Sequence, residues 1–304
     1  MGPRPSTFSI VASDVASGEI GIAVQSKFLS VGAVVPWVRA RAGAIATQAF
    51  ANTAYGPRAL ELLERGVPPD DVAQALLADD DGRDDRQFGI VAADGRATTF
   101  TGSRCISYAG GIAGSGFAAQ GNCLAGEAVV AALARTFEAT QGPLSDRLIA
   151  ALRAAQGAGG DKRGQQSAAL IVEKPHGGYA AFNDRYVDLR VDDHATRIDE
   201  LARLLQLHKL YFFAAEPHDV IDIDDALGEE LVRELHRVGA LARKHQNFDA
   251  TARETLVAYM HVENLENRVR DDGRIDRQTL DYLRAAPSAP TASRVTAAFQ
   301  NDHS

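Results

Sequence analysis

Cysteine is scarce in this chain of 304 residues, which contains only Cys105 and Cys123. The two cysteines have neither the C-x-x-C spacing nor the companions that a structural zinc site or a disulfide framework requires. We therefore expect two free, buried thiols, and no metal or other cofactor. The sequence also lacks an export signal and any run of about 18 apolar residues, the length that a membrane span needs. A cytoplasmic protein without a membrane partner is the expectation.

Positive charge is also in short supply, because 32 Lys and Arg face 40 Asp and Glu and the formal net charge is −8. Affinity for nucleic acids rests mainly on Lys and Arg that neutralise phosphates, so this balance argues against a nucleic-acid partner. Hydrophobic residues make up 45% of the chain. A chain of this length and composition can bury a substantial core and form more than one domain.

Glycine is nearly absent from the last third of the chain, where only Gly228, Gly239 and Gly273 lie beyond residue 200. Before that point strand-like runs alternate with glycine turns, and after it helical patterns are joined by short acidic stretches. The change predicts an α/β domain at residues 7–205, a small helical domain at residues 206–285 and a disordered tail at residues 286–304.

Within residues 7–205 the patterns predict strands, two helices, strands, two helices and strands, in that order. Strands are expected at residues 8–14 and 19–27, within 33–50, as a hairpin with an Asp-Gly turn in 87–102, and at 167–174 and 179–191. Helices are expected at residues 55–66, 68–80, 126–139 and 144–157. This order indicates an α+β fold in which two antiparallel sheets stack face to face with helices outside, rather than a parallel sheet.

The second part of the chain has the pattern of a small helical bundle. A linking helix is expected to begin at Thr196, followed by three amphipathic helices at residues 226–244, 249–265 and 275–286. The acidic run at residues 219–225 lacks the central glycine and terminal glutamate of a calcium-binding loop. We therefore interpret this run as a solvated acidic linker.

Most common catalytic motifs are missing from the sequence. GIAVQSK is not a Walker A loop, GGIAGSGF is not a G-x-S-x-G nucleophile elbow, and H-E-x-x-H does not occur. Only His176 and His194 precede residue 200. A serine or cysteine nucleophile in the first domain therefore has few possible bases.

An N-terminal threonine needs no histidine, because its own α-amine acts as the general base. Thr7 directly precedes a strand pattern, and it is a candidate nucleophile if the residues before it are removed. Such a site also needs a cation to lower the pKa of the amine, donors for an oxyanion and groups that grip the substrate. Polar residues at strand ends and glycine-rich turns supply candidates: Lys27 and Asn122 as catalytic residues, and Thr47, Gln48, Asn52, Asp161, Arg163 and Ser167 as substrate-binding residues.

Most of these candidates also have a structural interpretation, which the sequence leaves open. Thr7 can be a strand-capping hydroxyl, Asn122 a turn residue beside glycine, and Lys27 a solvated strand residue. Polar groups of Thr47, Gln48 and Asn52 can satisfy buried backbone groups, and Asp161 and Arg163 can form a surface salt bridge.

The candidates lie in blocks that together resemble the DUF1028 family of the Ntn-hydrolase superfamily. The blocks are TFSIVASD, GIAVQSKFLSVGAVVPW, AIATQAFANTAYGPRALELL, RQFGIV, QGNCLAGEAVV, GGDKRGQQSAAL and DLRVDDH, and they span about residues 7–205. The resemblance implies a four-layer α-β-β-α sandwich and a chain that commonly begins Met-Thr-Phe-Ser. It also implies hydrolysis of an amide-type C–N bond, with Thr7 as nucleophile and base.

Residues 206–285 resemble a helical extension, described as peptidoglycan-binding, that is often attached to this family. The glycine- and tyrosine-rich turn of peptidoglycan binders is replaced here by VGALARKHQNFD. Because the sequence also has no export signal, peptidoglycan is not the expected ligand.

Two functions follow from the sequence. The first is an Ntn-type amidohydrolase that cleaves an amide bond of a small metabolite, as a homo-oligomer, once residues 1–6 have been removed from Thr7. The second is a ligand-binding or scaffold protein without catalysis, whose helical domain recruits a partner. The segment GPRPS before Thr7 separates them, because a threonine whose nitrogen stays acylated has no amine to act as base.

Overall fold

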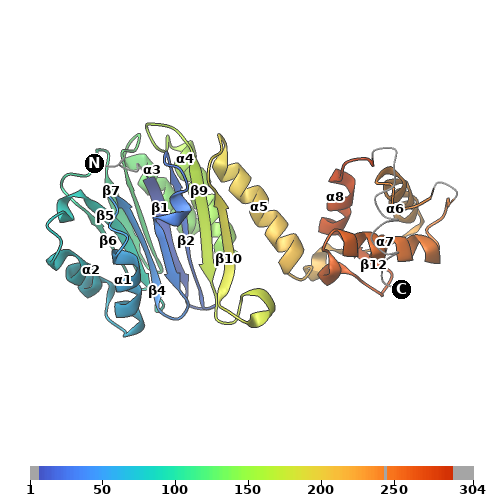
Figure 1. Ribbon diagram of the computed structural model, residues 1–304, viewed down its shortest axis with the longest axis horizontal. Helices are drawn as coiled ribbons and strands as arrows, with labels where there is room; N and C mark the ends of the chain where they lie inside the picture. The colour runs from blue at the N-terminus through green and yellow to red at the C-terminus, as the bar shows by residue number, and fades with distance from the viewer. Residues whose placement is uncertain (1–6, 243–244, 290–304) are drawn as a thin grey trace, which may run out of the picture. The chain divides into compact units, whose positions relative to one another are not determined.

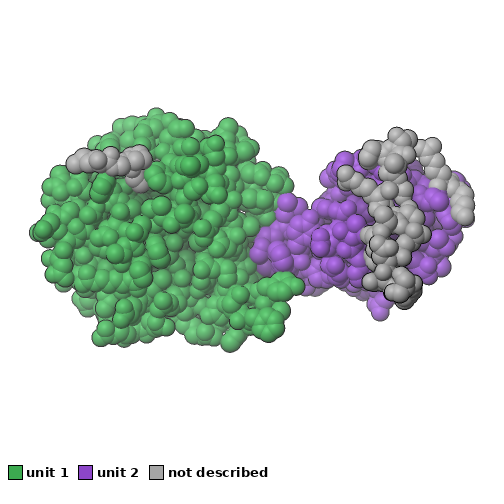
Figure 2. All heavy atoms as spheres, in the orientation of Figure 1, with its two compact units in different colours: residues 1–205 green, residues 206–304 purple. Residues whose placement is uncertain are grey.

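Two antiparallel sheets form the centre of the first of two units into which the chain divides, Met1–Leu205 and Gln206–Ser304 (Figure 1) (Figure 2). This computed structural model describes residues 7–242 and 245–289. The six-stranded sheet has the order β10 (Arg185–Val191), β9 (Ser167–Glu173), β2 (Glu19–Ser26), β1 (Thr7–Asp14), β8 (Phe117–Asn122) and β7 (Gly110–Gly114). The four-stranded sheet has the order β3 (Pro36–Arg39), β4 (Gly43–Ala49), β5 (Arg86–Ala92) and β6 (Ala97–Thr101).

Helices cover the outer face of each sheet, as Figure 1 shows. The four-stranded sheet carries α1 (Tyr55–Glu64) and α2 (Pro69–Ala78), and the six-stranded sheet carries α3 (Glu127–Ala139) and α4 (Leu144–Gly157). Between the sheets, Ile22 and Val24 pack in one core with Ala46 and Val91. The inner sheet faces are therefore apolar over most of their area, which makes buried polar groups between them informative.

For the first unit, the predicted antiparallel sheets and the predicted order of strands and helices are confirmed. β1 and β2 form a hairpin that turns at Gly18, and β5 and β6 form a hairpin that turns at Gly95, where the backbone φ angles are +72° and +86°. Glycine adopts this left-handed conformation without steric cost. β7 and β8 were not expected, because their sequences GGIAG and FAAQGN have no clear alternation of apolar and polar residues.

The second unit is helical, as expected, but it also contains two short strands. Its helices are the end of α5 (Arg197–Phe212), α6 (Asp225–Arg237), α7 (Ala250–Val262) and α8 (Arg277–Ala285). The predicted acidic linker is wrong in part, because β11 (Val220–Asp222) pairs with β12 (Arg274–Asp276). α6 ends before the predicted residue 244, and Gly239 follows it with a φ of +76°. Of the predicted tail, residues 290–304 lie outside the described residues.

Short 3₁₀ turns connect these elements at Val31–Ala33, Arg83–Asp85, Tyr179–Ala181, Pro217–Asp219 and Glu266–Arg268. Among residues 7–242 and 245–289, no helix has the length and apolar character needed to cross a membrane.

Candidate functional site

A row of polar residues runs across the six-stranded sheet, at the end of the sheet where β1 begins and β2 ends. Asn122 pairs with Thr7, Thr7 with Ser26, and Ser26 with Ser167, so that four adjacent strands each place a polar residue in register. Across the sandwich, the four-stranded sheet has a second row, in which Gln87 pairs with both Gln48 and Thr101. The two rows lie at the same end of the sandwich, because the Gln48 amide donates a hydrogen bond to the carbonyl oxygen of Thr7.

Thr7 begins the strand next to the middle of the larger sheet and is buried. Its Oγ1 lies 3.1 Å from the Oγ of Ser26, and its carbonyl oxygen lies 3.4 Å from Nε2 of Gln48. Two fixed contacts therefore hold both the side chain and the carbonyl of Thr7. A hydroxyl held in this way has the pre-organisation that a nucleophile needs.

Buried amides connect Thr7 to Asn122 through the opposite sheet. Gln87 Oε1 accepts hydrogen bonds from Gln48 Nε2 at 2.8 Å and from Asn122 Nδ2 at 2.9 Å. The hydroxyl of Ser9 donates to Gln48 Oε1 at 2.6 Å and accepts from Gln120 Nε2 at 2.7 Å. A buried polar network costs free energy unless its members are paired, so its presence between apolar sheet faces suggests a function.

A small hollow beside Asn122 has room for about one water molecule. It is lined by Ala49, Phe50, Asp85, Arg104, Cys105, Ile106 and Asn122. Phe50 and Ile106, which are 37% and 47% exposed, contribute apolar surface to its lining. Burial raises the pKa of the Cys105 thiol, so this cysteine is a poor candidate for a nucleophile.

The backbone is strained on both sides of this hollow. Ala49, at the end of β4, has a φ of +63°, and Cys123, directly after Asn122, has a φ of +54°. These angles are unfavourable for residues that carry a Cβ, and such strain clusters at functional sites. The strain therefore supports a functional assignment of this end of the sandwich.

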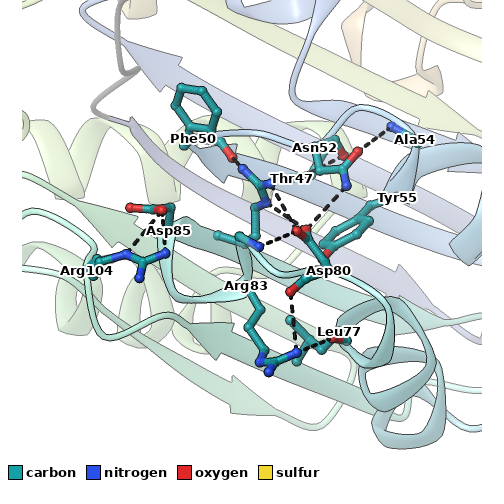
Figure 3. Close-up of polar contacts among 12 residues, drawn as sticks. Thr47, Phe50, Asn52, Ala54, Tyr55, Leu77, Asp80, Arg83, Asp85 and Arg104 are labelled. Carbon is teal, nitrogen blue, oxygen red and sulfur yellow. Dashed lines mark hydrogen bonds and ion pairs between the residues drawn. The ribbon is translucent and has the colours of Figure 1, made fainter. Parts of the chain in front are cut away.

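A cluster around Asp80 holds the loop that carries Phe50 (Figure 3). The Asp80 carboxylate accepts hydrogen bonds from Tyr55 Oη at 2.6 Å, from Arg86 Nε at 2.8 Å and from Asn52 Nδ2 at 3.4 Å. Arg86 also donates to the carbonyl oxygen of Phe50 at 2.7 Å. Hydrogen bonding to Arg86 lowers the pKa of Asp80, whereas burial and the contact with Asp80 raise the pKa of Tyr55.

Asp80→Asn is expected to lower the free energy of unfolding by about 3 kcal/mol at neutral pH, because it removes one charge from a largely buried pair. Since the folded-state pKa of Asp80 is lowered, its contribution is present above about pH 4 and is lost as the pH falls below that value. Urea unfolding at a series of pH values should therefore show the difference between the two proteins shrinking in acid. Asp79→Asn, at an exposed neighbour, is the control; a gap between wild type and Asp80→Asn that stays constant in acid would contradict this assignment.

A second group of predicted residues braces the loop after β2. Asp161 is buried, and its carboxylate accepts hydrogen bonds from the backbone N–H of Lys27 at 3.1 Å and of Arg163 at 2.8 Å. The Ser167 hydroxyl accepts a hydrogen bond from the N–H of Val31 at 3.0 Å. The side chains of Lys27 and Arg163 are exposed. These residues hold the backbone that follows Ser26.

The predicted residues thus fall into three groups. Thr7, Gln48 and Asn122 belong to one hydrogen-bonded network. Asn52 belongs to the cluster around Asp80, because its amide contacts the Asp80 carboxylate. Thr47 joins this cluster because its hydroxyl donates to the carbonyl oxygen of Asn52 at 3.4 Å. Lys27, Asp161, Arg163 and Ser167 form the brace behind Ser26. No group of His, Cys, Asp and Glu suited to a metal ion occurs among the described residues.

Four members of the network were missed in the sequence, and Ser26 and Gln87 are the two that contact Thr7 and Asn122 directly. Ser26 ends the strand pattern EIGIAVQS, and Gln87 opens the pattern QFGIVA. A polar residue at the end of an apolar strand is ordinarily solvated, so the pattern itself does not mark it as buried. One signal was available: Ser26 ends and Gln87 precedes an apolar run that does not alternate with polar residues, and such runs are typical of strands buried on both faces.

Comparisons with known proteins cover both units. A model for the "Family of unknown function (DUF1028)" matches residues 7–201, and a model for a "Putative peptidoglycan binding domain" matches residues 211–283. The crystal structure of a protein from Silicibacter pomeroyi, which carries the same DUF1028 model, is similar with a TM-score of 0.62. The two chains are 34% identical, and the match covers 67% of this chain and 86% of that chain. The comparison with curated proteins finds no match.

Proposed function

Since the chain belongs to the DUF1028 family, whose function is unknown, we propose an activity from its site: an Ntn-type amidohydrolase with Thr7 as nucleophile. The observation that carries the proposal is the position of the Thr7 hydroxyl. Ser26 holds this hydroxyl by a hydrogen bond, and Thr7 pairs with Asn122 on the neighbouring strand β8. The stacking order of helices, sheet, sheet and helices in the first unit supports assignment to the four-layer Ntn sandwich.

Maturation is the first step of the proposed mechanism. Thr7 Oγ1 attacks the carbonyl carbon of Ser6, the C–N bond between the two residues breaks, and an ester forms. Water then hydrolyses the ester, which leaves a carboxylate on Ser6 and a free amine on Thr7. The amine of an N-terminal threonine has an ordinary pKa of about 7.7 to 8.0, so it can serve as base near neutral pH.

Turnover uses the same hydroxyl. The Thr7 amine takes the proton from Oγ1, directly or through one water, while Oγ1 attacks the carbonyl carbon of a bound amide. The Asn122 amide donates a hydrogen bond to the developing oxyanion. The amine product leaves with a proton from the Thr7 ammonium, and water hydrolyses the acyl ester. Amides with apolar acyl groups are the first to screen, because the exposed Phe50 and Ile106 side chains lie beside Asn122.

The experiment uses a shortened chain in which Met directly precedes Thr7, so that aminopeptidase removal of Met exposes the threonine. Its hydrolysis of acetyl, butyryl and phenylacetyl nitroanilides is compared with that of the full-length chain. Release of nitroaniline by the shortened chain supports the proposal. A folded chain that begins at Thr7 and releases none from any of the three anilides would count against an amidohydrolase of this specificity.

Asn122→Ala is expected to lower kcat on the anilide by about 10²–10³-fold, the loss typical of a removed oxyanion donor. KM should change less, because the donor acts mainly on the transition state. Steady-state kinetics check this expectation, and Gln120→Ala, which removes a neighbouring amide that contacts Ser9, is the control. If kcat is the same in Asn122→Ala and wild type, Asn122 has no role in catalysis.

The competing function is ligand binding without turnover. The segment GPRPS before Thr7 favours it, because the Thr7 nitrogen stays acylated as long as this segment is attached. This function predicts ligand-induced thermal stabilisation of the full-length chain without product. Product that depends on Thr7 would rule it out.

A further inference from the structure

Gln87 contacts both Gln48 and Asn122, and from its contacts we infer that it is a positioning residue that fixes the direction of the Asn122 amide. Gln87 is the second residue of β5 and is buried. It reaches across the sandwich to the β8 strand that carries Asn122. The inference rests on the proposed function, since it assigns a role in that same site.

A backbone carbonyl sets the orientation of the Gln87 side chain. Gln87 Nε2 lies 2.8 Å from the carbonyl oxygen of Gly121, which can only accept a hydrogen bond. The nitrogen must therefore point toward Gly121, and it also donates to Thr101 Oγ1 at 2.9 Å. As a result, Oε1 points toward Gln48 and Asn122, whose amide nitrogens lie at 2.8 and 2.9 Å.

The orientation of Asn122 follows from that of Gln87. Because Gln87 Oε1 accepts, Asn122 must present Nδ2 to it and not Oδ1. Nδ2 donates one of its two hydrogens to Gln87. This contact fixes the plane of the Asn122 amide, and with it the direction of the second hydrogen on Nδ2. Oxyanion donors depend on such pre-organisation, since a donor that must reorient loses much of its effect. Without Gln87, the Asn122 amide loses the acceptor that selects this orientation.

Gln87→Glu tests this role because a glutamate reproduces the contacts in only one protonation state. A protonated carboxyl donates to the Gly121 carbonyl and accepts from Asn122, whereas an ionised carboxylate opposes that carbonyl with negative charge. Burial favours the protonated form up to a higher pH than usual. The described neighbours of Gln87 on β4, β6, β7 and β8 do not ionise: Gln48, Thr101, Gly110, Gly121 and Asn122. The charged groups at this end include the amine of the mature Thr7 and the side chains of Lys27, Asp85, Arg86, Arg104, Asp161 and Arg163.

The measurement is the ratio of kcat for Gln87→Glu to kcat for wild type, with phenylacetyl nitroanilide, from about pH 5 to about pH 9. Using the ratio cancels the titration of the Thr7 amine, which both proteins share. We expect a ratio near unity in acid that falls on the order of 10²-fold as the glutamate ionises, with little change in KM. Gln25→Glu is the matched control, because Gln25 is also buried but lies on the opposite face of β2 from Ser26.

A folded Gln87→Glu protein whose ratio stays constant over this range overturns the inference, and so does an equal pH dependence in Gln25→Glu. If Gln87→Glu does not fold, Gln87→Met takes its place, with kcat expected to be lowered at every pH; an unchanged kcat overturns the inference. Failure of the proposed function itself gives a different result, because then either the wild-type chain that begins at Thr7 releases no nitroaniline or turnover survives Thr7→Ala. Loss of turnover in Thr7→Ala together with wild-type behaviour at position 87 overturns only the role of Gln87.

Discussion

Replacing Thr7 by alanine, in a chain that begins at residue 7, is expected to abolish hydrolysis of the nitroanilide, with a loss of at least about 10³-fold in kcat. The substitution removes the attacking oxygen and leaves the α-amine in place. Alanine also fits the buried strand position, because it removes only the hydroxyl contact with Ser26 and a methyl group. Circular dichroism should therefore show a folded protein.

Two variants make the Thr7 result specific. Thr7→Ser keeps the hydroxyl and should keep measurable turnover. Ser9→Ala removes a buried hydroxyl on the same face of the same strand, with contacts to Gln48 and Gln120, and should reduce turnover far less than Thr7→Ala. Equal activity in wild type and a folded Thr7→Ala protein would mean that another group performs the attack.

Arg268→Met is expected to lower the free energy of unfolding of the helical unit by about 3–5 kcal/mol, the cost of breaking a buried ion pair. The Arg268 and Asp276 side chains are 1% and 0% exposed and lie 3.2 Å apart. Arg268 also donates to the carbonyl oxygens of Lys209 and Leu210, near the end of α5. Methionine fills much of the volume but leaves the Leu210 carbonyl without the Arg268 donor, whereas the Lys209 carbonyl keeps a hydrogen bond from the N–H of Phe213 at 3.0 Å.

Guanidinium unfolding of the full chain gives the size of this effect, and peptide-resolved hydrogen exchange localises it. Faster exchange should be confined to residues 206–289. The control is Arg274→Met, because Arg274 is 44% exposed and Asp272 retains its second partner, Arg270. Exposed pairs contribute about 0–1 kcal/mol. A loss of similar size in both variants would contradict the structural role of Arg268.

Local signals predicted most of the fold. The Asp-Gly turn identified the β5–β6 hairpin, and apolar spacing identified α3 and α4 to within a residue of their observed bounds. β11 was missed because its strand character depends on pairing with β12, far along the chain. The capping aspartates of α6, α7 and α8 show that acidic residues in this unit begin helices as well as solvate loops.

The site was predictable only where chemistry restricts the residue type. An N-terminal nucleophile must be Thr, Ser or Cys at the start of a strand, so Thr7 could be singled out. Nothing local marks Gln87 as a neighbour of Asn122, since the contact crosses between two sheets. Likewise Asp161 looks like a loop residue in sequence, although its carboxylate is fully buried under the backbone of Lys27.

The most direct test of the central claim is intact mass and N-terminal sequencing of the protein purified from its natural source. The proposed mechanism requires a free amine on Thr7, and therefore predicts a mature chain that begins Thr-Phe-Ser. A chain that begins at Gly2 and retains Pro3 and Pro5 would contradict it, because Thr7 would then have no amine to act as base.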